Sequence, residues 1–132
     1  MVLVDSSAWI EVFRRDTKLA LTSVVDFDEI VTCPPVVQEV LQGFRDERAY
    51  RLAHEAMHAL PIVESPMFLG VFDQAASLYR SARHSGITVR SGVDCLIAAC
   101  ALRNNLEVLH VDRDFDALAQ ITPLRIRSVS SR

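Results

Sequence analysis

Two short apolar runs in this chain each end in an aspartate, and this pattern narrows the choice of fold more than any other feature. Residues 2–4 read Val-Leu-Val and are followed by Asp5, while residues 108–111 read Val-Leu-His-Val and are followed by Asp112. Apolar runs of this length predict buried strands. In an open α/β sheet, ligands bind beyond the carboxyl ends of the strands, so we expect both aspartates to face the same crevice.

Two further carboxylates stand on predicted helices. Asp94 lies in the first turn of an almost wholly apolar helix over residues 93–102, and Glu39 interrupts an apolar pattern over residues 36–41. Two carboxylates about 4 Å apart repel each other by roughly 4 kcal/mol at an effective dielectric constant near 20. A group of three or four therefore needs shared protons or a divalent cation, and an all-oxygen ligand set favours Mg²⁺ or Mn²⁺.

Each of these residues also has a purely structural explanation. Asp5 can cap the helix that follows it, and Glu39 can mark the polar edge of its own helix. Asp94 stands three residues after Ser91, which is the spacing of a capping box. Against this, the helix face that continues from Asp94 is apolar, and a carboxylate at the head of such a face is partly desolvated and needs a partner. The joint arrangement favours a shared site.

Strands and helices alternate along the chain. The predicted strands cover residues 2–5, 29–33, 62–63, 107–111 and 124–126. The predicted helices start after Ser6 or Ser7, cover residues 19–27, 34–44 and 114–119, run from residue 65 to a stop at Gly86, and begin at the caps Asp46 and Ser91. This order predicts an α/β fold with a mainly parallel sheet and helices on both faces. The length of 132 residues predicts a single domain over residues 1–132, and half of these residues are apolar, which is enough for a hydrophobic core.

The composition of the chain indicates its compartment and narrows the kinds of partner it can bind. The net charge of −3 provides no footprint for tight, non-specific binding to polyanions, although a bound metal would offset part of it. Three cysteines without a C-x-x-C pair (Cys33, Cys95 and Cys100) predict buried thiols in a reducing compartment. Neither a signal peptide nor an apolar segment approaching the 18 or so residues of a membrane span is visible. We therefore expect a soluble, cytoplasmic protein that does not enter the membrane.

Four segments together resemble the PIN-domain nucleases. They are Val-Asp-Ser-Ser-Ala-Trp-Ile at residues 4–10, Glu39, Asp-Cys-Leu-Ile-Ala-Ala at residues 94–99, and His-Val-Asp-Arg-Asp-Phe at residues 110–115. The resemblance spans nearly the whole chain, in the family's order and with similar spacings. Within that family, a short single-domain chain is most similar to the VapC toxins of type II toxin–antitoxin pairs.

The resemblance implies a set of site residues. The carboxylates that would bind one or two Mg²⁺ or Mn²⁺ ions are Asp5, Glu39, Asp94 and Asp112, with Asp114 as an auxiliary ligand. Ser7 would be the accessory hydroxyl that orients a ligand or a water. One position departs from the family pattern, because many members carry Thr or Ser where this chain has His110. Either His110 takes over a hydrogen-bonding role, or the position is dispensable and the histidine is structural.

The same resemblance implies an activity and partners. We expect a metal-dependent endoribonuclease that leaves 5′-phosphate and 3′-hydroxyl ends on tRNA or another structured RNA. A cognate VapB-like antitoxin would wrap the early helices and block the crevice, and a homodimer is expected. Arg90 and Arg113 are candidates for holding RNA phosphates beside the crevice, since guanidinium groups suit bidentate phosphate contacts. The alternative for both is a solvated surface.

Other classes of protein fit less well. Residues 54–58 match the zinc-protease motif H-E-x-x-H, but His54 and His58 point away from the apolar stripe of their predicted helix. A phosphoacceptor receiver domain needs an acidic residue beside Asp5 and a late lysine, and a D-x-D phosphatase needs a second aspartate, whereas Ser6 and Ser7 follow Asp5. The remaining alternative is a non-catalytic PIN-like module that binds RNA or protein. Such a module is expected to have lost a core carboxylate, and this chain has all four.

Overall fold

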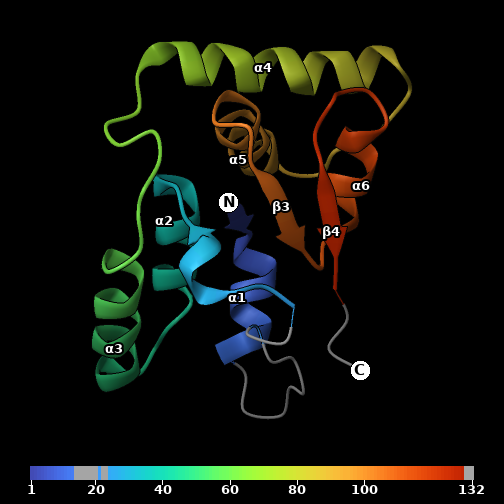
Figure 1. The fold of residues 1–132 in the computed structure, drawn as a ribbon. Helices are drawn as coiled ribbons and strands as arrows, with labels where there is room; N and C mark the ends of the chain where they lie inside the picture. The colour runs from blue at the N-terminus through green and yellow to red at the C-terminus, as the bar shows by residue number, and fades with distance from the viewer. Residues whose placement is uncertain (14–20, 22–23, 130–132) are drawn as a thin grey trace.

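The structure is a computed structural model that describes residues 1–13, 21 and 24–129, with strands and helices in alternation (Figure 1). The strands are β1 (Val2–Val4), β2 (Ile30–Val31), β3 (Glu107–His110) and β4 (Ile126–Ser128). The helices are α1 (Ser6–Phe13), α2 (Pro34–Gln42), α3 (Glu47–His58), α4 (Leu69–His84), α5 (Gly92–Arg103) and α6 (Arg113–Ala119), and a 3-10 turn, η2, covers Phe27–Glu29. The predicted α/β class is confirmed.

The sheet is parallel throughout and has the strand order β2-β1-β3-β4. The chain moves from β1 to β2 in one direction and then crosses to β3 and β4 in the other. Because such connections are right-handed, α1 covers one face of the sheet, and α5 and α6 cover the opposite face. The predicted parallel sheet with helices on both faces is therefore confirmed. Val4 pairs with Leu109, so the two central strands end at the same edge.

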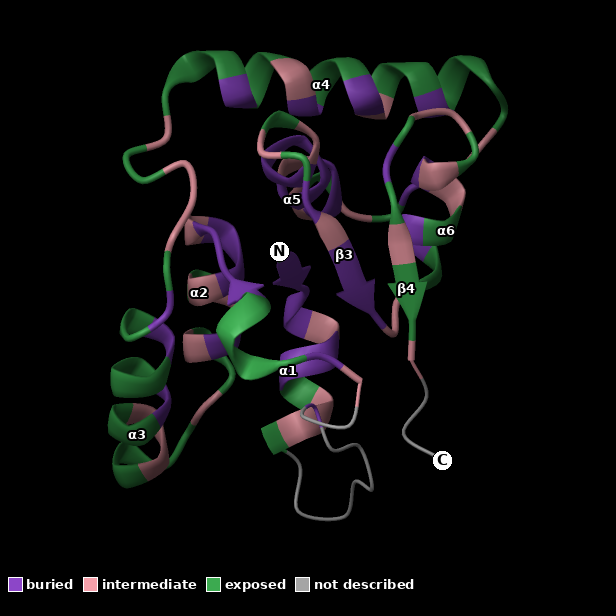
Figure 2. Cartoon of the chain, viewed as in Figure 1, coloured by how far each residue is buried: buried purple, intermediate pink, exposed green. Residues whose placement is uncertain are grey.

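Helix α5 lies at the centre of the molecule and is buried on almost every side (Figure 2). It packs between β3 and α4, and α4 runs across one end of the molecule (Figure 1). The side of α4 that contacts α5 carries its buried residues, Val71, Ala75, Leu78 and Ala82. Fully burying one such aliphatic side chain of Val or Leu contributes roughly 1.5–3 kcal/mol. Packing on both sides of α5 therefore leaves Asp94 buried, although the helix begins with an exposed residue, Gly92.

Predicted helix ends agree with the structure where a cap or a left-handed residue sets them. The Asp46 carboxylate accepts a hydrogen bond of 2.8 Å from the Ala49 amide at the start of α3. The Ser91 hydroxyl accepts one of 3.2 Å from the Val93 amide at the start of α5. Gly86 adopts a φ of +72° just after α4, a conformation that favours glycine. The three cysteines are free and buried, as predicted.

The start of α4 is where the sequence prediction was wrong. The helix begins at Leu69 rather than near residue 65, because Phe68 has an extended backbone with φ −94° and ψ 164°. Phe68 and Phe72 continue the helical spacing of the apolar residues in the sequence, but their exposed fractions are 72% and 46%. The buried positions of α4 start instead at Val71 and recur every three or four residues, which turns Phe68 and Phe72 away from α5.

Smaller differences concern the sheet edges and one helix. The last strand covers Ile126–Ser128 rather than residues 124–126, and the predicted edge strand at residues 62–63 is a single bridge between Thr32 and Ile62. Of the predicted helix over residues 19–27, residues 19, 20, 22 and 23 lie outside the described residues. Residues 24–26 form a turn rather than an α-helix, and η2 begins at residue 27. Among the described residues, no helix is long and apolar enough to cross a membrane.

Candidate active site

The two central strands deliver Asp5 and Asp112 to the same edge of the sheet. The Asp5 amide donates a hydrogen bond of 2.9 Å to the Leu109 carbonyl, which continues the β1–β3 pairing one residue past β1. Two residues beyond β3, Asp112 caps α6, and its carboxylate accepts a hydrogen bond from the Asp114 amide at 2.9 Å. The shared carboxyl edge of these strands is thus acidic, as the strand-end pattern predicts.

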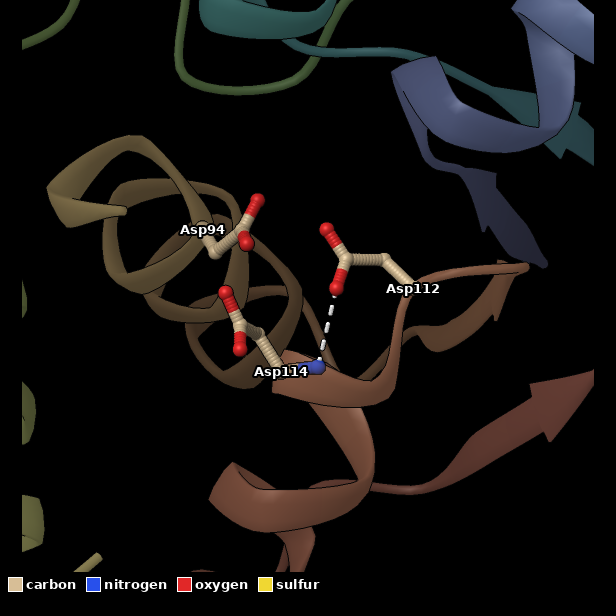
Figure 3. A group of neighbouring side chains, drawn as sticks. All are labelled: Asp94, Asp112 and Asp114. Atoms are coloured by element: carbon tan, nitrogen blue, oxygen red, sulfur yellow. Dashed lines mark hydrogen bonds between the residues drawn. The ribbon is translucent and has the colours of Figure 1, made fainter. Parts of the chain in front are cut away.

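Three carboxylates converge beside this edge (Figure 3). Asp94 projects from the first turn of α5, while Asp112 and Asp114 lie at the start of α6. One carboxylate oxygen from each of the three lies within 4.8 Å of the others. Asp94 and Asp114 are buried and Asp112 is half-buried. We call these three residues the aspartate cluster. Sequence reasoning ranked Asp114 as auxiliary, yet the structure includes it in this compact group.

Asp5 and Glu39 form the second part of the acidic region. Asp5 is buried, and one of its oxygens, Oδ2, accepts hydrogen bonds from the Ser7 amide at 3.0 Å and from the Ser7 hydroxyl at 2.5 Å. Glu39 is half-buried and accepts a hydrogen bond of 2.6 Å from the Ser6 hydroxyl. The sequence pointed to Ser6 only as one of two residues after which a helix starts. Its position directly after Asp5 was the one available signal, because the link to Glu39 spans 33 residues.

The carboxylates of this region are buried and repel one another, and bound protons remove only part of this repulsion. Burial raises the pKa of Asp94 to about 8, and repulsion from Asp5 and Asp112 adds to the rise. Burial also raises the pKa of Asp5 to about 6, against the lowering effect of the Ser7 hydrogen bonds, and repulsion from Glu39 adds to this rise. Asp5 therefore interacts electrostatically both with Glu39 and with Asp94 of the aspartate cluster. At neutral pH the metal-free protein retains a proton in the cluster, and a cation would replace it.

The donor atoms fit a hard divalent ion. Asp5 Oδ1 and Asp94 Oδ2 are buried oxygens without a hydrogen-bond partner in the described part of the chain. Buried carboxylate oxygens are rarely left unsatisfied unless a ligand or proton takes them. The cluster offers oxygen ligands alone, which is the preference of Mg²⁺ and Mn²⁺, and lacks the cysteine or histidine ligands typical of zinc sites.

The two candidate arginines occupy different environments. Arg90 lies in the loop before α5 and forms ion pairs with Asp114 at 3.3 Å and Asp112 at 3.1 Å. Hydrogen bonding to Asp114, followed by attraction to the same carboxylate and to Asp112, raises the pKa of Arg90 above its ordinary value. Arg113, one residue past Asp112, is exposed. Of the two arginines, the structure thus brings Arg90 onto the aspartate cluster.

His110 has a hydrogen-bonding role in this structure, which decides between the alternatives that the sequence left open. The imidazole is fully buried, and its Nδ1 accepts a hydrogen bond of 3.2 Å from the Asp112 amide. Its Nε2 lies 3.6 Å from an Asp116 carboxylate oxygen, and the ring packs on Phe115. Burial lowers the pKa of His110. The neutral imidazole therefore fixes the backbone that carries Asp112.

Ser7 links the ends of the two central strands. Its hydroxyl donates to Asp5 and accepts a hydrogen bond of 3.2 Å from the Val111 amide.

We expect Ser7→Ala to lower the free energy of unfolding by about 1–2 kcal/mol, because it leaves a partly buried amide without an acceptor. Urea denaturation measures this loss. Ser77→Ala, at an exposed position on α4, is the control and is expected to change stability by less than about 0.5 kcal/mol. Equal midpoints for the two variants would contradict the bridging role.

The histidines of the H-E-x-x-H segment do not form a site with a third ligand among the described residues. His54 and His58 are exposed on α3, and their rings stack with centroids 4.1 Å apart. The buried positions of that helix are Ala53 and Met57, so both histidines point to solvent, as predicted. Leu52 is also exposed, because the buried side of α3 is formed by Ala53 and Met57.

Comparisons with known proteins agree with this architecture. The family model of the PIN domain matches residues 2–121. The chain is 38% identical to ribonuclease VapC11 of Mycobacterium tuberculosis (strain H37Rv) over 97% of its own length and 98% of that protein. It is 28% identical to ribonuclease VapC17 of the same organism, with 92% and 89% covered.

Solved structures of toxin–antitoxin proteins share the fold. A chain of VapBC-5 from Mycobacterium tuberculosis superposes with a TM-score of 0.70 and 26% identity over 97% of this chain and 98% of that one. A chain of VapBC2 from Rickettsia felis, solved with a DNA fragment from its promoter, has a TM-score of 0.78 at 12% identity over 98% and 100% of the two chains. The strand-end aspartates, the aspartate cluster and these matches lead to one conclusion: the chain belongs to the PIN-domain family and, within it, to the VapC group.

Proposed function

We propose that this protein is a metal-dependent endoribonuclease that acts as the toxin of a type II toxin–antitoxin pair. The observation that carries the proposal is the aspartate cluster, in which three carboxylate oxygens lie within 4.8 Å and two of the residues are buried. Such a group is costly without a cation, and its oxygen ligands fit Mg²⁺ or Mn²⁺. The 38% identity to the ribonuclease VapC11 supports the same reaction for this chain.

The carboxylates have different roles in the proposed metal site. The aspartate cluster would hold one or two Mg²⁺ or Mn²⁺ ions, with Asp5 and Glu39 completing the acidic group. A divalent ion bound there supplies positive charge at the scissile phosphate and at the leaving oxygen, and makes water a better nucleophile at neutral pH. Ser7 occupies Asp5 Oδ2, which leaves Asp5 Oδ1 as the oxygen available to a ligand or a proton.

The substrate has to be held by local basic groups, since the chain as a whole carries a net charge of −3. Arg113 is exposed one residue past Asp112, and the Arg90 side chain is also mostly exposed at the aspartate cluster. The Arg90 guanidinium therefore borders the acidic region where a phosphodiester would enter, and Arg113 is the neighbour of Asp112 in the sequence. A planar guanidinium pairs with two phosphate oxygens at once. This arrangement supports RNA as the substrate, and we infer a structured RNA such as tRNA.

An apolar groove supports the proposed antitoxin partner. It has a volume of about 220 Å³ and lies between α1 and α2, lined by Ile10, Phe13, Val40, Gly43 and Phe44. Several related structures, including VapBC-5, are toxin–antitoxin proteins. We infer that a VapB-like antitoxin covers this groove and reaches toward the acidic region, and that the pair is cytoplasmic, where its RNA substrate is found. The exposed side chains of Phe68, Leu69 and Phe72 support a homodimer.

Cleavage of a tRNA pool tests the activity. The protein, purified without antitoxin, is incubated with total tRNA and Mn²⁺ or Mg²⁺, beside a sample with EDTA. We expect discrete fragments only with the metal, and we expect their new ends to be 5′-phosphate and 3′-hydroxyl groups, since a water attacks phosphorus and the 3′-oxygen leaves. Ligation-based end mapping identifies the ends. Fragments that form equally in EDTA, or that end in a 2′,3′-cyclic phosphate, would exclude this mechanism. A folded protein that cleaves no RNA pool would favour the non-catalytic alternative.

A further inference from the structure

Arg90 makes more contacts with the aspartate cluster than any other described side chain outside it. Its Nε donates to Asp114 Oδ1 at 3.3 Å, and its backbone amide donates to Asp114 Oδ2 at 3.2 Å. Its Nη2 donates to Asp112 Oδ1 at 3.1 Å. Arg90 therefore engages both oxygens of one cluster carboxylate and one oxygen of another. Asp94, the third member, is not among the hydrogen-bond partners of the guanidinium and keeps a buried oxygen without a hydrogen-bond partner in the described part of the chain.

These contacts place the positive guanidinium of Arg90 against two of the carboxylates that a divalent ion in the proposed site would use as ligands. Among the ion pairs of the described residues, Arg90 supplies the positive partner of both Asp112 and Asp114. A divalent ion that takes these carboxylates as ligands competes with the guanidinium for the same oxygens and is repelled by its charge. The Arg90 side chain is 57% exposed, so it can leave the cluster for solvent without breaking the core.

We propose that Arg90 is the internal counter-ion of the metal site: it holds Asp112 and Asp114 in place in the metal-free protein and releases them when a divalent ion binds. The proposal rests on the proposed metal-dependent function. It assigns Arg90 a positioning role in the metal-free state that differs from a direct contact with substrate. The exchange is one of ion pairs alone, in which the guanidinium keeps its proton and moves toward water while the carboxylates turn to the ion.

Arg90→Gln tests this proposal, because glutamine keeps the backbone amide that binds Asp114 and removes the positive charge. We expect the Kd for Mn²⁺, measured by isothermal titration calorimetry, to fall at least about tenfold, since the variant removes a competing charge within the site. We also expect the metal-free variant to melt at a lower temperature than the metal-free wild type, and saturating Mn²⁺ to close this gap. The rise in melting temperature on adding Mn²⁺ is therefore larger in the variant.

Arg113→Gln is the matched control, because it removes one positive charge beside Asp112 from an exposed side chain. Its Kd for Mn²⁺ is expected to change less than about threefold, since a solvent-exposed charge is well screened. An Arg90→Gln Kd equal to or weaker than that of the wild type would overturn the counter-ion role while leaving the metal site intact. An equal loss of melting temperature with and without Mn²⁺ would also overturn it, because that is the behaviour of a merely structural ion pair. A wild-type chain that binds no Mn²⁺ would overturn both this inference and the proposed function.

Discussion

Asp94→Asn is expected to abolish RNA cleavage and, in the same protein, to raise the thermal stability of the metal-free state at pH 8. Asp94 is the buried member of the aspartate cluster that makes no ion pair with Arg90. Changes to the outer-shell partners of metal ligands cost 10–100-fold in affinity or activity, so we expect loss of a ligand to cost more than about 100-fold. A single-turnover cleavage assay with saturating Mn²⁺ measures this loss.

The gain in stability has a separate physical cause. Burial and neighbouring carboxylates raise the pKa of Asp94 to about 8, so its ionised form is less favourable in the folded protein than in the unfolded chain, by about 1.4 kcal/mol for each unit of pKa shift. At pH 8 the unfolded chain is ionised at this position, and the wild-type fold is therefore destabilised relative to a fold with a neutral side chain. Asparagine has a similar shape and carries no charge, and its amide can donate to the neighbouring carboxylates. We expect the melting temperature of the metal-free variant at pH 8 to rise by roughly 5 °C or more.

A matched control separates this effect from any loss of a surface carboxylate. Asp73 is exposed on α4, and Asp73→Asn is expected to leave both cleavage and melting temperature nearly unchanged. An Asp94→Asn protein that is less stable than the wild type at pH 8 would show that the aspartate stabilises the metal-free fold. An Asp94→Asn protein that cleaves RNA at the wild-type rate would remove Asp94 from the active site.

The second large effect is a loss of stability with rising pH that Mn²⁺ reverses. The folded-state pKa of Asp94, about 8, lies far above its unfolded value near 4, so between these values the folded protein binds more protons than the unfolded chain. The contribution of Asp94 to the free energy of unfolding is therefore fully present below the unfolded pKa, and it is lost as the pH rises through about 8. From pH 6.5 to 8.5 we expect the metal-free protein to lose about 2 kcal/mol, or roughly 5 °C of melting temperature.

This pH window is chosen to isolate Asp94. Asp5 has already lost most of its contribution by pH 6.5, because its folded-state pKa is about 6. Burial lowers the pKa of His110, so its contribution has the opposite sign and is lost as the pH falls below about 6.5. Saturating Mn²⁺ is expected to restore stability most strongly at pH 8.5, where the ion no longer displaces a proton. A flat pH profile, or a profile that is equally steep in Asp94→Asn, would contradict this account.

The acidic edge of the sheet could be predicted from the sequence because it depends on local patterns. Apolar runs that end in Asp5 and Asp112 predict parallel strands, and parallel strands bring their carboxyl ends together. The registered pairing of β1 with β3 follows this expectation. The helix starts at Ser91 and Asp46 are equally local, since each cap side chain bonds an amide only two or three residues away.

Individual side-chain contacts between residues distant in the sequence could not be predicted. Arg90 and Asp114 are 24 residues apart in the sequence, and they meet where α5 contacts α6. A spacing rule cannot distinguish such a contact from a solvated arginine. The predicted start of α4 was wrong for a related reason. The helical spacing of apolar residues includes Phe68, although the backbone of Phe68 is extended. Exposed aromatics at a helix end look like core residues in a sequence.

The most direct test of the central claim is the rate of RNA cleavage by EDTA-treated protein as free Mn²⁺ is raised. If the aspartate cluster holds the catalytic ion, cleavage is absent without metal, rises with Mn²⁺ and saturates at the concentration at which calorimetry shows the site to be filled. Asp94→Asn shows neither the binding nor the cleavage. Cleavage in EDTA at the metal-saturated rate would contradict the account, because the acidic group would then have a role other than binding a catalytic ion.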